Sequence, residues 1–220
     1  MKVIVFGSNG LVGSSITRIL EDSIKVDQLI KSNRSELDLF NKKHVEEFVK
    51  EHEPDVVINA AAKVGGIHAN DTKRTEFILE NLKINMNVLE SCIEMPMIKI
   101  INLGSSCIYP LNAENPINES EFMNGKLEPT NSPYAMAKLS AIEIGRSMSK
   151  QFGHKVLNLM PTNLYGPNDY FSDLDSHVIP ALIHRMQKTI ENNEDKFTVW
   201  GSGSPLREFL YVDDLSNFIN

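Results

Sequence analysis

Residues 1–13 read MKVIVFGSNGLVG, and this stretch decides the fold class. Lys2–Phe6 is apolar and β-branched, which predicts a short buried strand, and a helix is expected over Ser14–Leu20. In such a strand–turn–helix the first glycine permits the turn, the second admits a pyrophosphate, and the third lets helix and strand pack closely. The stretch therefore predicts a dinucleotide site, with a ligand-free glycine turn as the alternative, and its candidate cofactor residues are Gly7, Ser8, Asn9, Gly10, Leu11, Val12 and Gly13.

Strand and helix patterns alternate along the rest of the chain. Further helices are expected at Lys42–Glu51, Thr75–Ile93 and Tyr134–Phe152, and further strands at Val26–Ile30, Asp55–Asn59, Ile98–Leu103, Val156–Met160 and Phe197–Trp200. Strands that are apolar on both faces and alternate with helices predict an α/β fold with a doubly wound, Rossmann-like parallel sheet.

We expect two parts in this fold. Residues 1–165 and 197–220 would form the cofactor-binding domain, and residues 166–196 would be part of a substrate-binding domain. The loop over residues 110–133 is long, polar and placed directly after a central strand, which is typical of an active-site element.

Composition excludes several classes of protein. Hydrophobic residues make up 41% and charged residues 23% of the chain, as in soluble globular proteins. The net charge of −7 gives no general attraction for nucleic acid, and no apolar run is long enough to span a membrane. The N-terminus lacks the pattern of an export signal, and Cys92 and Cys107 match neither a disulfide framework nor a zinc motif. We therefore expect a cytoplasmic protein without a metal.

The end of the second strand indicates which dinucleotide binds. NAD sites usually place an acid there for the ribose 2′-hydroxyl, whereas an arginine accommodates a 2′-phosphate. This chain reads LIKSNR at residues 29–34, with Lys31 and Arg34 and no acid before Glu36. The pattern favours NADP(H), and a solvated basic turn is the alternative.

Three further residues form a set that can carry out carbonyl chemistry. Tyr134 and Lys138 are one helical turn apart, and Ser105 follows the fourth strand at the edge where ligands of open α/β sheets bind. A neighbouring ammonium is expected to lower the pKa of the tyrosine, and the serine hydroxyl could hold the reacting oxygen. Tyr-x-x-x-Lys alone is common on surface helices, but together with the glycine turn and the serine after the fourth strand it is a strong signal for carbonyl chemistry.

Longer strings in the sequence add a family resemblance. They are AAAKVGGI (60–67), LGSSCIYP (103–110), LEPTNSPYAMAK (127–138), MPTNLYGP (160–167), SHVIPALI (176–183) and WGSGSPLREFLYVDD (200–214). With the glycine turn they resemble the GDP-L-fucose synthase family of the extended short-chain dehydrogenase/reductases. The resemblance implies NADPH-dependent 3,5-epimerisation and 4-reduction of GDP-4-keto-6-deoxy-D-mannose.

The resemblance also implies roles for single residues. Ser105, Tyr134 and Lys138 would perform the reduction, while Cys107 and His177 would perform the epimerisations. Without the family, Cys107 reads as a small core residue and His177 as a surface histidine. Cofactor contacts would extend to Arg34, Ala61, Lys138, Pro161, Thr162, Asn163, Leu164 and His177, and substrate contacts to Arg185, Trp200 and Arg207. The family often forms homodimers through two long helices, here about 75–93 and 134–152.

Two departures from the family leave alternatives open. Family members can carry a basic residue where this chain has Asn9, so the 2′-phosphate would depend more on Arg34. Family chains also continue beyond residue 220, so the remainder of the substrate-binding domain would lie outside this sequence. The alternatives are an NAD-dependent sugar-nucleotide 4-epimerase, a 4,6-dehydratase, or a truncated, non-catalytic NADP-binding relative. A dehydratase usually has an acidic pair where this chain has Ser106 and Cys107, and a 4-epimerase has no use for Cys107 and His177.

Overall fold

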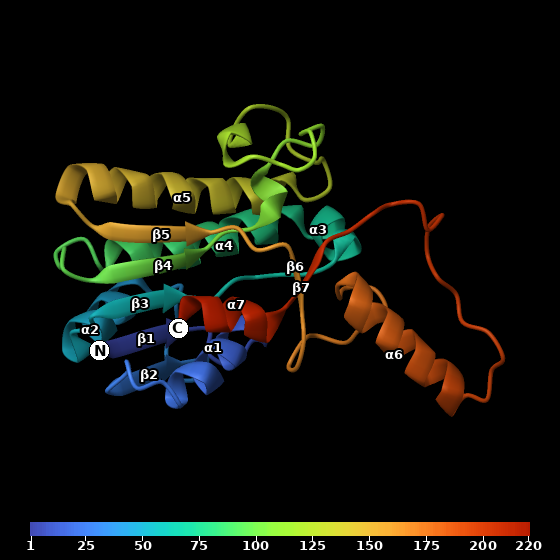
Figure 1. Ribbon diagram of the computed structural model, residues 1–220, viewed down its shortest axis with the longest axis horizontal. Coiled ribbons are helices and arrows are strands. Elements are labelled where there is room, and N and C mark those ends of the chain that lie inside the picture. Colours follow the sequence, from blue (N-terminus) through green and yellow to red (C-terminus); the bar gives the residue numbers. More distant parts are fainter.

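The centre of the molecule is a five-stranded sheet in the order β2-β1-β3-β4-β5 (Figure 1), in a computed structural model that describes residues 1–220. Every strand is parallel to its neighbours, which confirms the predicted doubly wound, Rossmann-like sheet. The strands are β1 (Lys2–Phe6), β2 (Gln28–Ser32), β3 (Val56–Asn59), β4 (Lys99–Leu103) and β5 (Lys155–Leu159). Because β2 and β3 lie on opposite sides of β1, the winding direction switches between β1 and β3, where ligands of such sheets bind.

Alternate residues of each strand enter two separate cores. Ile4 and Phe6 of β1 pack beneath α2 (Lys42–His52), α4 (Arg74–Glu90) and α5 (Ser132–Phe152) on one face. Val3 and Val5 pack on the other face with Ile16 of α1 (Leu11–Glu21). The last helix, α7 (Val212–Ile219), lies against α1, to which Asp213 is bound through Ser15 and Arg18. None of the helices combines the length and apolar character needed to cross a bilayer.

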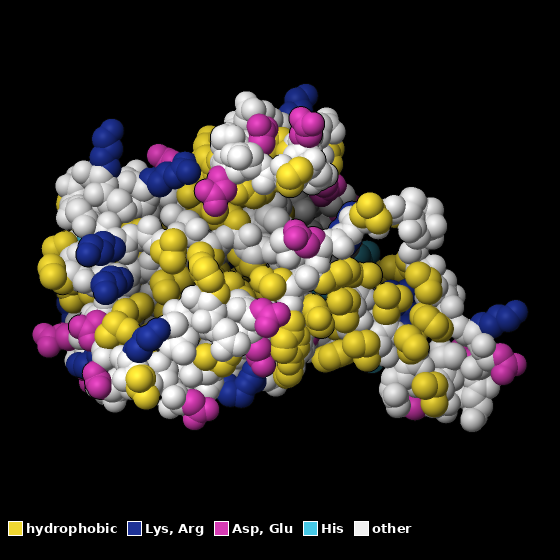
Figure 2. Space-filling view, viewed as in Figure 1, with side chains coloured by type: hydrophobic (Ala, Val, Ile, Leu, Met, Phe, Trp, Pro, Cys, Tyr) yellow, Lys and Arg dark blue, Asp and Glu magenta, His cyan; other side chains and the backbone are white.

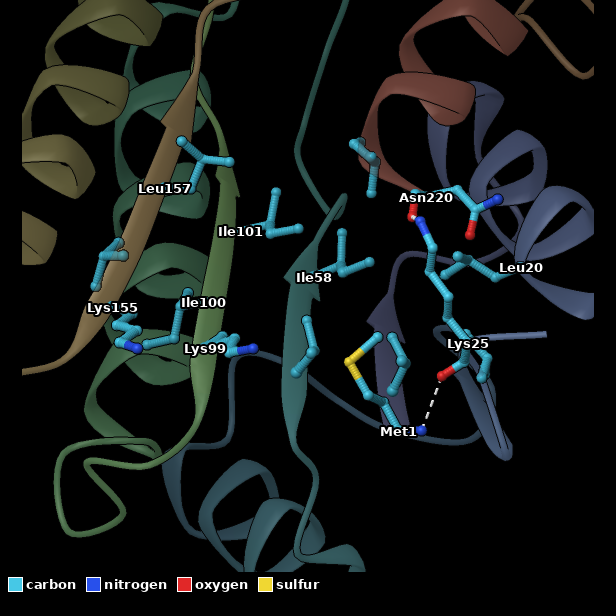
Figure 3. Close-up of a pocket in the computed structure, with 15 residues that line it drawn as sticks. Met1, Leu20, Lys25, Ile58, Lys99, Ile100, Ile101, Lys155, Leu157 and Asn220 are labelled. Atoms are coloured by element: carbon cyan, nitrogen blue, oxygen red, sulfur yellow. Dashed lines mark hydrogen bonds between the residues drawn. The ribbon is translucent and has the colours of Figure 1, made fainter. Parts of the chain in front are cut away.

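The second face of the sheet is incompletely covered. A groove of about 360 Å³ lies there, and Figure 3 shows Ile58, Ile101 and Leu157 of three strands lining it, with Leu20 and Asn220 on the opposite side. Leu157 keeps 50% of its surface exposed. The groove lies toward the amino ends of the strands, and no Asp, Glu, His or Cys side chain lines it. The groove therefore offers no carboxylate, imidazole or thiol group, and its charged side chains are those of Lys25, Lys99 and Lys155.

The chain leaves the main sheet after β5. It forms a small parallel pair from β6 (Asn163–Tyr165) and β7 (Phe209–Tyr211), with α6 (Val178–Glu191) and a long loop between them. In Figure 1, α6 and this loop stand apart from the sheet, and Figure 2 shows hydrophobic side chains gathered around β6 and β7. A short helix, α3 (Ile67–Thr72), follows β3 on the same side of the molecule.

Two predicted strands need correction. The strand expected at Val26–Ile30 is Gln28–Ser32, because the Met1 carbonyl accepts the Asp27 amide and sets the register that pairs Lys2 with Gln28. The strand expected at Phe197–Trp200 is wrong, because this segment is loop with no strand beside it. The strand in this part of the chain is β7, which has β6 as a pairing partner.

The contact between α1 and β1 yields a stability prediction. A Cβ on Gly13 would lie 2.1 Å from the Gly7 carbonyl oxygen, so Gly13→Ala must displace backbone and should lower the free energy of unfolding by about 1–3 kcal/mol. Gly10→Ala is the matched control, because its Cβ would have no such neighbour closer than 3.6 Å. Urea denaturation followed by circular dichroism measures both variants. Equal stability of the two would contradict the close contact.

Candidate active site

The glycine turn lies at the switch point of the sheet, between the carboxyl ends of β1 and β3. Gly7 has a φ of 77°, which favours glycine, and its Cβ would lie 2.7 Å from the Cα of Ala61 in the turn after β3. The amides of Gly7 and Ser8 donate to the Ser32 carbonyl at 3.0 and 3.1 Å, which ties the turn to β2. Three strand ends thus meet around this turn.

The turn fits a dinucleotide. Gly10 is exposed and precedes α1, and no side chain caps the amides of the first helical turn. No acid lies in that first turn either, so the positive end of the helix is open to a phosphate. Crowding at Gly7 and Gly13 contrasts with the open space at Gly10, as the three predicted glycine roles require.

The two cations expected at the end of β2 have different surroundings. Lys31 forms an ion pair with Glu21 of α1. Arg34 is exposed just beyond the strand and forms no salt bridge. Arg34 is therefore an unpaired cation at the end of β2, whereas Lys31 is paired with Glu21.

Ser105 and Cys107 lie together in the turn that follows β4. Ser105 is extended and precedes a single 3-10 turn over Ser106–Ile108, and its Oγ accepts the Cys107 amide at 3.4 Å. The Ser106 amide donates to the Pro161 carbonyl at 3.1 Å, which joins this turn to the segment after β5. The side chains of both residues are partly exposed. The second cysteine, Cys92, is buried in the core.

Tyr134 and Lys138 lie in the first two turns of α5. The Lys138 Nζ lies 5.7 Å from the centre of the Tyr134 ring and donates to the Leu103 carbonyl of β4 at 2.6 Å. Phe77 of α4 packs edge-on against the same ring, with centroids 6.3 Å apart. The lysine is therefore anchored to the sheet, and the tyrosine of α5 packs against α4.

Burial dominates the ionisation of these groups. It lowers the pKa of Lys138 to about 8, and it raises the pKa of Tyr134 instead of the expected lowering by the lysine. Tyr134 is thus a protonated acid near neutral pH. The pKa of Cys107 is also raised by burial, with Ser105 and the charge of Lys138 acting in the opposite direction. Lys138 contacts both the Tyr134 ring and the end of β4, and the turn that holds Ser105 and Cys107 follows that end, so these groups belong to one site.

His177 is the residue before α6, and its side chain is partly buried and makes no cap bond to the helix. Burial lowers its pKa, and the negative charge of Asp169 acts in the opposite direction. One carboxylate oxygen of Asp169 accepts the Tyr170 amide at 2.8 Å, while the other is buried without a partner. No motif in the sequence pointed to Asp169, because only the folding of residues 169–177 brings its charge near the histidine.

The remaining candidate residues fall into two groups. The candidate cofactor residues Pro161 and Thr162 lie between β5 and β6, and Asn163 and Leu164 lie in β6.

The candidate substrate residues lie farther along the chain. Arg185 of α6 stacks on Trp200, with its Cζ 4.5 Å from the ring centre, and donates to the Thr198 carbonyl at 3.0 Å. Arg207 is exposed in the loop before β7 and bonds only to its neighbouring carbonyl. The structure therefore brings together Arg185 and Trp200 but not Arg207.

The family is indicated by similarity over nearly the whole chain. Residues 3–219 match the family model described as the NAD dependent epimerase/dehydratase family. The chain is 49% identical over 216 residues to putative GDP-L-fucose synthase 2 of Arabidopsis thaliana, covering 98% of this chain and 66% of that protein. It is 45% identical over 215 residues to GDP-L-fucose synthase of Escherichia coli (strain K12), covering 98% of this chain and 67% of that protein.

A solved structure is similar as well. The GDP-L-fucose synthetase of Naegleria fowleri bound to NADP superposes with a TM-score of 0.87 at 32% identity, covering 99% of this chain and 71% of that chain. The chain spans about two thirds of the length of the curated relatives that it matches. These similarities agree with the glycine turn and the parallel sheet. The chain therefore belongs to the NAD dependent epimerase/dehydratase family.

Proposed function

We propose that the protein converts GDP-4-keto-6-deoxy-D-mannose to GDP-L-fucose, by NADPH-dependent 3,5-epimerisation and 4-reduction. The observation that carries the proposal is the thiol of Cys107 beside Tyr134 and Lys138, because a simple reductase or 4-epimerase has no use for a thiol there. The names of the relatives from Arabidopsis thaliana and Escherichia coli support the same activity.

The cofactor would bind across the switch point. Residues Gly7–Gly13 would receive the pyrophosphate on open amides, and Arg34 would meet the 2′-phosphate. The nicotinamide would lie near Pro161–Leu164, Ala61 and His177. When bound, NADPH supplies the hydride that reduces the C4 carbonyl.

Reduction would use the residues at the end of β4 and the start of α5. The Ser105 hydroxyl would hold the C4 oxygen, and the protonated Tyr134 would donate a proton to that oxygen. A raised pKa suits the donor role, because the phenol keeps its proton until the oxygen becomes basic. Lys138, held by the Leu103 carbonyl, would stabilise the phenolate that forms.

Epimerisation would use Cys107 and His177. The C4 ketone acidifies the protons on C3 and C5, so the Cys107 thiolate can remove each of them. His177 can then return a proton on the opposite face of the ring. The charge of Lys138 favours the thiolate, and the charge of Asp169 favours the protonated imidazole.

The rest of the substrate would be held outside the main sheet. Residues 166–196 would form part of a substrate-binding domain, with residues 1–165 and 197–220 as the cofactor domain. Arg185, stacked on Trp200, and Arg207 would bind the GDP part.

A homodimer would pair the helices α4 and α5, whose outer faces expose Leu79, Met86 and Met136. Two free thiols suit a reducing cytoplasm.

Cofactor preference is the first test of this proposal. Arg34→Asp should weaken NADPH binding and relatively favour NADH, because a carboxylate repels the 2′-phosphate and can accept the 2′-hydroxyl. Lys31→Ala is the control and should keep the preference, because Lys31 is paired with Glu21. Fluorescence titration with both cofactors measures the affinities. Equal affinities of the unaltered protein for NADPH and NADH would refute the assignment.

The activity itself is tested with GDP-4-keto-6-deoxy-D-mannose and NADPH. The protein should oxidise NADPH and release GDP-L-fucose, and Tyr134→Phe should slow this reduction by about 100-fold or more. The variant keeps the ring that packs against Phe77, so its fold should be retained. No NADPH oxidation by the unaltered protein would refute the function, and normal oxidation by Tyr134→Phe would refute its role as proton donor.

The thiol is tested by exchange with solvent. Cys107→Ser should largely stop deuterium incorporation at C3 and C5, followed by NMR, because an alcohol is a much weaker base than a thiolate. Reduction of the unepimerised ketone should continue and give a 6-deoxy sugar other than fucose. His177→Asn should instead allow proton removal while correct reprotonation fails. Unaltered exchange at both carbons in Cys107→Ser would return this residue to a packing role.

A further inference from the structure

The segment that carries His177 touches the glycine pair before α3. The Gly66 amide donates to the Asp175 carbonyl at 2.8 Å, across more than a hundred residues of sequence. A Cβ on Gly66 would lie 2.3 Å from the Ser176 carbonyl oxygen, and a Cβ on Gly65 would lie 3.3 Å from that of Asp175. The two backbones are therefore in direct contact, and at Gly66 the distance leaves no room for a Cβ.

Side chains of α3 and of Lys73, the residue that follows it, hold both partners of this contact. Asn70 is buried, and its Nδ2 donates to the Gly65 and Gly66 carbonyls at 2.7 and 3.0 Å. The Asp175 carboxylate accepts Lys73 Nζ at 2.7 Å and lies 3.4 Å from the His68 ring nitrogen. These ion pairs border an open hollow and are partly exposed, so they contribute less than the backbone contact.

This contact lies directly beside His177 at the start of α6, where Pro180 and Ala181 are the buried residues of the helix. His177 is the next residue after Ser176 and directly precedes the helix. No other helix or strand packs extensively against α6, which stands apart from the main sheet in Figure 1. Gly65 and Gly66, in contrast, follow β3, whose end adjoins the glycine turn.

We propose that Gly65 and Gly66 are positioning residues for His177: they join its backbone to the sheet edge that carries Ser105, Cys107 and the cofactor turn. The inference rests on the proposed function, in which His177 reprotonates the sugar ring. A shift of about 1 Å in such a group can cost about 100-fold in rate. The glycine pair would thus determine the stereochemistry of the product without touching the substrate.

The test compares the Gly66→Ala variant with the unaltered protein and with the Gly145→Ala variant. Gly66→Ala should keep NADPH affinity and deuterium exchange at C3 and C5, but lower correct reprotonation by about 10- to 100-fold and release unepimerised 6-deoxy sugar. Gly145→Ala is the matched control, because its Cβ would crowd Val156 at 2.8 Å in another part of the fold. Gly145→Ala should keep the product ratio, which is the ratio of GDP-L-fucose to the unepimerised 6-deoxy sugar.

A double variant separates positioning from a general structural defect. Gly66→Ala should add nothing to the product ratio of His177→Asn, because both changes remove the same step. Additive effects, or an unchanged product ratio in Gly66→Ala, would overturn the inference. If the unaltered protein forms no product, the proposed function fails instead.

A milder variant keeps the test decisive should Gly66→Ala not fold. Asp175→Ala removes the ion pairs with Lys73 and His68 and leaves the backbone bond to Gly66. It should change the product ratio in the same direction and by less. An unchanged ratio in Asp175→Ala, with Gly66→Ala unfolded, would overturn the inference.

Discussion

The contact between the first turn of α1 and the end of β1 is the constraint on which the rest of the structure depends. Gly13 lies against the Gly7 carbonyl at a distance that leaves no room for a side chain, and a Cβ on Gly7 would lie 2.7 Å from the Cα of Ala61. These approaches bring the helix N-terminus, β1 and β3 to one point. The open amides of α1 therefore lie where the sheet changes its winding direction, and this is where an anion is best stabilised.

A second feature of the site is the competition between burial and charge. Burial raises the pKa of Tyr134 and Cys107 and lowers that of Lys138 and His177, so each group is pushed toward its neutral form. A neutral phenol is a ready proton donor, which suits the proposed reduction. A neutral thiol is a weak base, so in the proposed epimerisation the nearby Lys138 charge and the ketone of the substrate would together favour proton removal.

The two candidate acids are held in different ways. Tyr134 belongs to α5, which packs on α4 and the main sheet, so its position follows from the core. His177 belongs to a segment outside that core and is joined to it through the Gly66–Asp175 bond. A reductase needs only the first arrangement. The second arrangement matters for an enzyme that must also deliver protons to one chosen face of a sugar ring.

The sequence by itself determined the parallel sheet, the glycine turn and the placing of Ser105, Tyr134 and Lys138 at one edge. These follow from short-range patterns, since strand periodicity, glycine spacing and one helical turn are set by neighbouring residues. It predicted a strand at Phe197–Trp200 wrongly, because an apolar run forms a strand only where a partner offers hydrogen bonds, and that partner faces Phe209–Tyr211 instead.

Only the tertiary structure decided that Lys31 is paired with Glu21, that the charge of Asp169 acts on His177, and that burial outweighs Lys138 in setting the pKa of Tyr134. Each of these depends on how separate helices, strands and loops pack and on the exclusion of water, and no local pattern carries that information.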